Sequence, residues 1–192
     1  DLCNPNQPLL RRLQIEAPGT YHHSLIVSNL AEAAAERIGA NQYLARAAGY
    51  YHDIGKLKRP QYFKENQGGS NPHDHLDPYV SSAILTSHTR DGYQMALKEK
   101  MPQEVADIIL CHHGDTPVMY FYHKALQMSN GSPVDMAEFQ VVVVCRIKNV
   151  YALQVVNAEK SHCNGGYHPN SDFKFFRDFK FHIFDFLLET YL

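Results

Sequence analysis

Histidines near the ends of predicted helices restrict the fold of this chain more than any other feature. The run Tyr50-Tyr51-His52-Asp53-Ile54-Gly55-Lys56 sets a histidine beside an aspartate, and more histidines stand upstream and downstream of it. Imidazole and carboxylate are common protein ligands of divalent transition metals. Ligands this scattered cannot form a local zinc finger, whose ligands come in close pairs. They predict several helices that bring their histidines to one or two metals, and this points to metal-assisted hydrolysis.

The first predicted helix carries a pair of histidines. Thr20 is expected to cap a helix that runs to about Ile38 and stops at Gly39, a favoured residue after a helix. His23 should face the interior, and His22 the neighbouring face. The apolar stripe of this helix consists of Val27, Leu30, Ala34 and Ile38.

A second helix should follow Asn41, lead into His52-Asp53 and end near Gly55. A third starts at Asp77-Pro78, a cap followed by Pro at the first helical position, and should end by Gly92. In the helix after Asn41 the apolar stripe is Leu44, Ala45, Ala48 and Tyr51. In the helix that starts at Asp77-Pro78 the apolar stripe leads to His88 and consists of Val80, Ile84 and Leu85. In both helices the apolar stripe therefore runs up to a histidine.

The rest of the chain gives further helices and a long loop. Pro102 opens a helix whose stripe, Val105, Ile108 and Ile109, leads to His112. Residues 119–127 are expected to be helical, and residues 129–133 form a break. Residues 60–78 are expected to be a loop of the length that is often functional. Residues 141–144 fit a buried strand or a buried helix, and residues 182–191 resemble a helix. The predicted fold class is all-α.

The composition of the chain bears on its number of domains and on its class of binding partner. The chain has 192 residues, enough for a single domain over residues 1–192, with 44% apolar and 20% charged residues. A formal net charge of −2 does not favour a DNA- or RNA-binding protein, which would normally carry a basic patch. No apolar run is long enough to span a membrane, so no membrane contact is expected from this segment. The chain starts at Asp1 without an initiator Met, and we expect it to be a piece of a longer protein.

The chemistry of the candidate residues follows from their positions. On a helix, His52 and Asp53 would point about 100° apart, so the imidazole could hold one metal while the carboxylate reaches between two. Lys56 could offer positive charge to a phosphate oxygen. Alternatively, it could be a solvated lysine that interacts favourably with the negative, C-terminal end of the helix dipole. His73 is a candidate because it lies in the long loop beside Asp74. The remaining histidines are expected to be surface or core residues: His75, His123, His162, His168 and His182.

Several motifs in order carry a resemblance to a known family. They include residues 16–24 (EAPGTYHHS), 52–60 (HDIGKLKRP), 62–67 (YFKENQ), 112–114 (HHG) and 121–125 (FYHKA). Over residues 6–139 the chain resembles the HD-domain metallohydrolases, and within them the cytosolic domain of the seven-transmembrane HD proteins that hydrolyse cyclic di-AMP. The resemblance is weak over residues 140–192.

The resemblance implies a helical bundle with a long loop after the His-Asp helix, and two divalent transition-metal ions, iron or manganese. The implied metal ligands are His23, His52, Asp53, His88, His112 and His113. It further implies a phosphodiesterase that opens cyclic di-AMP to linear pApA with a metal-activated hydroxide. From their positions in the sequence we expect Asp53 and Lys56 to be catalytic, and Lys56 and His73 to bind the substrate. The parent protein would lie in a bacterial cell membrane with this domain in the cytoplasm, and a homodimer is compatible with it.

The chain departs from the family after Phe139. The family would place an Asp that closes the metal site in a later helix, but an ungapped count puts Ala158 there, between Asn157 and Glu159. Glu159 is the nearest carboxylate and is our candidate for the missing ligand. Two alternatives stay open: an HD phosphohydrolase that acts on a mononucleotide, and a non-catalytic HD sensor that binds metal or dinucleotide.

Overall fold

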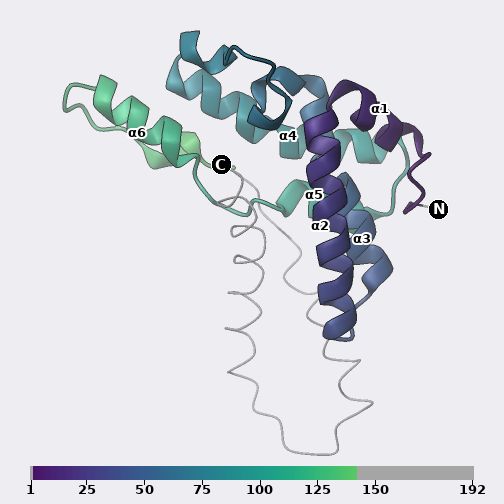
Figure 1. The fold of residues 1–192 in the computed structure, drawn as a ribbon. Helices are drawn as coiled ribbons and strands as arrows, with labels where there is room; N and C mark the ends of the chain where they lie inside the picture. Colours follow the sequence, from purple (N-terminus) through teal and green to yellow (C-terminus); the bar gives the residue numbers. More distant parts are fainter. Residues whose placement is uncertain (1, 142–192) are drawn as a thin grey trace, which may run out of the picture. The chain divides into compact units, whose positions relative to one another are not determined.

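The computed structural model describes residues 2–141, which form α-helices and short 3₁₀ helices without a β-strand (Figure 1). An isolated bridge joins Pro117 and Gln140. The α-helices are α1 (Pro8–Glu16), α2 (Pro18–Arg37), α3 (Gln42–Tyr51), α4 (Pro78–Lys98), α5 (Gln103–Cys111) and α6 (Met119–Met128). The 3₁₀ helices are η1 (Ile54–Lys58), η2 (Pro60–Tyr62), η3 (Lys64–Asn66), η4 (Pro72–His75) and η5 (Met136–Phe139). The expected all-α class is confirmed for this part of the chain.

Helices α2 and α3 pack along each other, and α4 packs against α5, α6 and η1 (Figure 1). The main core is made of apolar side chains from α1, α3, η1, α4 and α5, which include Leu10, Leu13, Tyr51, Ile54, Val105 and Ile109. A smaller cluster joins α6 to η5 through Phe121, Ala125 and Phe139. In the segment that the structure describes, no helix is both long enough and apolar enough to cross a membrane.

The start and the buried face of α2 differ from the prediction. The helix begins at Pro18, so Thr20 is its third residue rather than its cap, and it ends at Arg37. Leu30 and Ile38, expected in the buried stripe, are 45% and 37% exposed. The buried residues of α2 are instead Thr20, Ser24, Val27, Ser28 and Ala35. A small-residue face is needed because α3 lies very close: a Cβ added at Gly49 would come 2.5 Å from Ser28 Cα.

Helix α3 starts as predicted and ends earlier. The Asn41 side chain accepts a hydrogen bond from Leu44 N and caps the helix. The last helical residue is Tyr51, and the chain then turns into η1 instead of continuing towards Gly55. His52 and Asp53 therefore lie in the turn between α3 and η1 rather than on a continuous helix.

Helix α4 starts as predicted and ends later. The Asp77 side chain accepts a hydrogen bond from Tyr79 N, and Pro78 occupies the first helical position. The helix does not end by Gly92 but continues to Lys98. Gly92 is needed for close packing: a Cβ added there would lie 2.7 Å from Ile109 Cγ2 and 3.1 Å from Gly55 N. η1 thus rests directly on the middle of α4.

Val80, expected in the apolar stripe of α4, is 48% exposed, but several other predictions on the described residues are confirmed. Residues 60–78, predicted as a loop, contain η2, η3 and η4 and no α-helix before α4. The helices predicted after residue 102 and over residues 119–127 correspond to α5 and α6. The break at residues 129–133 is confirmed, with Asn130 and Gly131 at positive φ. Residues 142–144 and 182–191, for which a strand or helix was predicted, lie outside the described residues.

Candidate metal centre

The candidate ligands come from four separate places in the fold. His23 lies in α2, and His88 lies inside α4 rather than at a helix end. His52 and Asp53 follow α3 directly, and His112 and His113 follow α5 in the same way.

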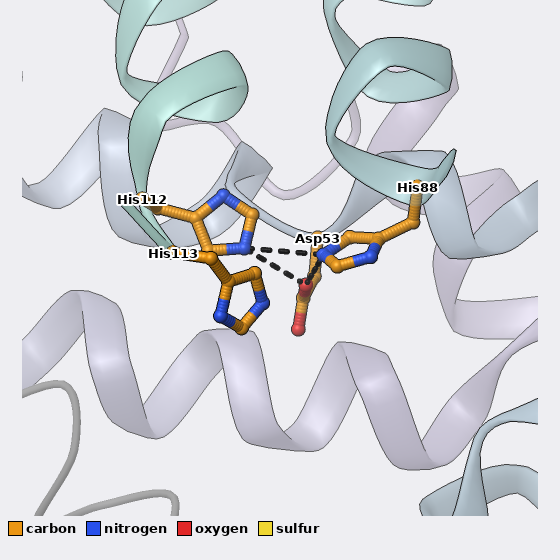
Figure 2. Close-up of side chains that lie close together, drawn as sticks. All are labelled: Asp53, His88, His112 and His113. Atoms are coloured by element: carbon orange, nitrogen blue, oxygen red, sulfur yellow. Dashed lines mark hydrogen bonds and ion pairs between the residues drawn. The ribbon is translucent and has the colours of Figure 1, made fainter. Parts of the chain in front are cut away.

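The Asp53 carboxylate lies between two groups of histidines. Its Oδ1 is 3.3 Å from His88 Nε2 and 3.6 Å from His112 Nε2. Its Oδ2 is 3.1 Å from His52 Nε2 and 4.0 Å from His23 Nε2. Figure 2 shows His88 and His112 approaching Asp53 from two different helices, with His113 beside them. The two oxygens therefore face different sets of imidazoles.

These contacts define two clusters that share Asp53. The first cluster is Asp53, His88, His112 and His113, and the second cluster is His23, His52 and Asp53. Within each cluster one potential ligand atom per residue lies within 4.8 Å of the others. Clusters of imidazoles around a carboxylate are a donor set that suits divalent transition metals.

The other ring nitrogen of three histidines is fixed by the helix that carries the residue. In each case Nδ1 donates a hydrogen bond to the carbonyl oxygen three residues earlier. The pairs are His52 with Gly49 at 2.8 Å, His112 with Ile109 at 2.8 Å, and His88 with Leu85. Such a bond fixes the tautomer and makes Nε2 the nitrogen that can bind a cation, as is usual for metal-ligating histidines.

This tautomer makes the centre of the first cluster electron-rich. The Nε2 atoms of His88 and His112 are 3.2 Å apart, and both face Asp53 Oδ1. That oxygen is buried, and among the described residues it has no hydrogen-bond partner. Unpaired lone pairs held this close repel each other unless a cation lies among them. The residues present therefore fit a metal ion.

Burial and nearby charges together determine the protonation of the candidate ligands. It lowers the pKa of His112 to about 4 and that of His113 well below its ordinary value, so both rings are neutral at pH 7. Burial alone would raise the pKa of Asp53, but the nearby His52 and Lys56 outweigh it and hold this pKa well below its usual range. Neutral imidazoles around an ionised carboxylate are the forms that bind metal.

Lys56 is an ion-paired residue beside the second cluster. Its Nζ lies 2.9 Å from Asp53 Oδ2 and 2.7 Å from Glu65 Oε1, and its side chain is 12% exposed. Burial alone would lower the pKa of Lys56, but Asp53 and Glu65 outweigh it and raise this pKa, so the ammonium stays charged. The alternative of a solvated lysine at a helix end is therefore wrong.

Glu65 is a residue of this site that sequence reasoning missed. It lies nine positions after Lys56, in η3, and the segment between them has no helical or strand periodicity that would bring the two together. The motif letters of residues 62–67 were the one signal that marked it. Its carboxylate lies beside Lys56 because η1, η2 and η3 fold the chain back on itself.

His73 lies apart from both clusters. It is buried, its Nε2 donates to Tyr62 O at 2.9 Å, and its ring packs against Phe121. Its role in substrate binding stays a prediction. The exposed positions of His75 and His123 agree with their expected surface character. His162, His168 and His182, together with Asn157, Ala158 and Glu159, lie outside the described residues, so ligation by Glu159 also stays a prediction.

Comparison with known protein families shows to which family this chain belongs. Residues 20–151, more than half of the chain, match the family model of the HD domain. The chain belongs to the HD domain family. The helical fold expected from the resemblance is thereby confirmed for this HD domain.

Two enzymes and a crystal structure are similar to this HD domain. The cyclic-di-AMP phosphodiesterase PgpH of Bacillus subtilis (strain 168) is 52% identical over 141 residues, 73% of this chain and 20% of that enzyme. The enzyme of the same name from Listeria monocytogenes is 56% identical over 126 residues, 65% of this chain and 18% of that enzyme. The chain thus spans about one fifth of the length of these relatives.

The crystal structure is that of the L. monocytogenes PgpH HD domain in complex with cyclic di-AMP. It matches with a TM-score of 0.68 and 51% identity, and the match covers 72% of this chain and 64% of that one. At this identity the comparison supports both the fold and the family assignment.

Proposed function

We propose that this HD domain is a metal-dependent phosphodiesterase that hydrolyses cyclic di-AMP to linear pApA. The position of Asp53, with one oxygen toward each histidine cluster, is the observation that carries the proposal. The relatives at 52% and 56% identity, both named as cyclic-di-AMP phosphodiesterases, supply the substrate.

The proposed ligands divide between the two clusters. His88, His112 and His113 would hold one ion and His23 and His52 the other, with Asp53 shared. We propose Glu159 as a further ligand on the motif alignment alone, because it lies outside the described residues. Two divalent ions, for which we propose iron or manganese, would activate water and neutralise charge on a phosphate when bound.

The chain's own groups would orient the substrate. The Lys56 ammonium, kept charged beside Asp53, is a point charge suited to a phosphate oxygen. The neutral His112 imidazole keeps its Nε2 lone pair on the interior of the site because its Nδ1 is already bonded. We also propose that His73 contributes to the binding surface for the substrate.

Activity assays on a substrate panel test this function. The 192-residue chain, loaded with Mn²⁺ or Fe²⁺, is incubated with cyclic di-AMP, cyclic di-GMP and mononucleotides, and the products are separated by chromatography. We expect cyclic di-AMP to give a linear product with a terminal phosphate, and the reaction to stop when a chelator is added.

Two outcomes would contradict the proposal. Turnover of mononucleotides alone would identify a different HD phosphohydrolase. Binding of cyclic di-AMP by metal-loaded protein without turnover would identify a sensor domain, the alternative raised by the altered sequence after Phe139. The larger parent protein in a bacterial membrane, the cytoplasmic location of this domain and a homodimer are proposals that follow from the resemblance.

A further inference from the structure

Glu65 is held in place from several sides at the start of α2. Its Oε1 accepts hydrogen bonds from both Thr20 Oγ1 at 2.9 Å and Lys56 Nζ at 2.7 Å. Its backbone presses against the first turn of the helix, where a Cβ added at Gly19 would come 1.9 Å from Glu65 O. Glu65 therefore has little freedom to move relative to α2.

The hydroxyl group of Thr20 has only one way to point. Asn66 Nδ2 donates to Thr20 Oγ1 at 2.7 Å, so the hydroxyl hydrogen is left to donate to Glu65. Asn66 Oδ1 also accepts from Thr20 N at 3.1 Å, which satisfies an amide of the first turn that has no partner within the helix. Thr20 is fully buried. The direction of the hydroxyl, and with it the position of the Glu65 carboxylate, is thus set by α2 and η3 together.

Lys56 is therefore shared between two carboxylates that differ in burial and in their membership of the two clusters. Asp53 is 3% exposed in its side chain and belongs to both clusters, whereas the Glu65 side chain is 31% exposed and belongs to neither. An ammonium paired with Asp53 alone would lie against Oδ2, the oxygen that His52 and His23 also face. There it would compete with a cation for that oxygen.

We propose that Glu65 is a positioning residue that shares the Lys56 ammonium, keeps Asp53 Oδ2 accessible to a metal ion and directs the ammonium toward a substrate phosphate. The inference rests on the proposed function in that it takes Asp53 as a metal ligand and Lys56 as a phosphate-binding group. It assigns to Glu65 an effect that passes through Lys56 and not through contact with metal.

A double-mutant cycle on Lys56 and Glu65 tests the inference. Mn²⁺ affinity is measured by calorimetric titration, and kcat/KM for cyclic di-AMP is measured on the same preparations of the 192-residue chain. The variants are Glu65→Gln, Lys56→Met and the double variant. Glu32→Gln is the matched control, because Glu32 is also ion-paired, with Arg46, and is 26% exposed.

Glu65→Gln should weaken Mn²⁺ binding roughly five- to tenfold, since the ammonium then pairs with Asp53 alone. Adding Glu65→Gln to Lys56→Met should change the affinity by less than about twofold, because the residue through which Glu65 acts is gone. kcat/KM should follow the same pattern, and Glu32→Gln should match the wild type in both measurements.

A second variant guards against a fold defect. Thr20→Val removes the donor to Glu65 and should weaken Mn²⁺ binding in the same direction, while Thr20→Ser should restore it. An equal loss from Glu65→Gln in both backgrounds would overturn the inference, because Glu65 would then act by its charge alone. Wild-type protein that binds Mn²⁺ but does not cleave cyclic di-AMP would instead overturn the proposed function and leave the metal cycle to decide the role of Glu65.

Discussion

Asp53 contributes to both clusters, so the chemistry of this residue cannot be assigned to one metal position. Its oxygens are each within 3.3 Å of an imidazole nitrogen, His88 on one side and His52 on the other. Asp53→Asn should weaken metal binding, because the amide carries no negative charge and its NH₂ group would donate to an imidazole nitrogen that is proposed to bind metal.

Neighbouring histidines on α2 offer a test at the scale of single residues. His23 approaches Asp53 Oδ2, whereas His22 is exposed on the adjacent face. His23→Ala should weaken binding of the second Mn²⁺ by at least about tenfold, as loss of a direct ligand has to cost at least as much as loss of an outer-shell partner. Titration calorimetry measures this, with His22→Ala as the control. Equal effects from both variants would show that the second cluster does not bind metal.

Residue identity predicted which histidines the structure brings together around Asp53, but it did not predict the residues that support them. Histidine and aspartate in this arrangement have few roles other than metal binding, so the pattern indicated His52, Asp53 and their partners before any fold was known. Residue type did not mark Glu65 in this way, because its proposed role depends on a contact with Lys56 that forms only when η1, η2 and η3 have folded. Acidic residues on surface segments are common, and sequence does not tell which of them meets a lysine.

At the scale of elements, the contact between η1 and α4 supports the site. A Cβ added at Gly55 would come 1.9 Å from His88 O, which belongs to the backbone of α4 at a proposed ligand. Gly55→Ala should therefore lower the free energy of unfolding by about 1–3 kcal/mol, the usual range for overpacking, and should also weaken Mn²⁺ binding.

Urea denaturation and Mn²⁺ titration measure the two effects of Gly55→Ala. Gly68→Ala is the matched control, because a Cβ added at Gly68 has no atom within 4 Å. If Gly55→Ala were as stable as Gly68→Ala and bound Mn²⁺ normally, the packing of η1 on α4 would not position His88.

The starts of α3 and α4 could be predicted from sequence, but the start and buried face of α2 and the ends of α3 and α4 could not. Asn41 and Asp77 cap their helices through their own side chains, which is a local effect. Thr20 has the same chemistry, yet the preceding proline begins the helix and the hydroxyl serves Glu65 instead. Gly92 does not end α4, because the glycine is required by the approach of Ile109 and Gly55. Tertiary packing decided both cases.

At the scale of the whole molecule, metal binding should raise stability. Ions that bind the folded chain alone, at about 100 times their Kd, stabilise it by roughly 2.7 kcal/mol. For a chain of this size the Tm should rise by roughly 5–10 °C. Scanning calorimetry of chelator-treated protein, with and without Mn²⁺, measures the shift. Asp53→Asn should show little shift, and an equal shift in this variant would mean that the ions stabilise the chain elsewhere.

The hydrogen bonds from Nδ1 to the carbonyl oxygen three residues earlier bear on which substitutions the candidate metal centre can tolerate during evolution. In many metal sites a separate side chain orients each imidazole, and a substitution at that partner damages the site. Here the partners of His52, His88 and His112 are backbone oxygens of their own helical turn. A substitution that keeps the turn also keeps the bond, although Gly49 itself cannot take a Cβ because of its contact with Ser28. The orientation of these candidate ligands is thus inherited from helix geometry, and it does not require a second side chain to be kept for each imidazole.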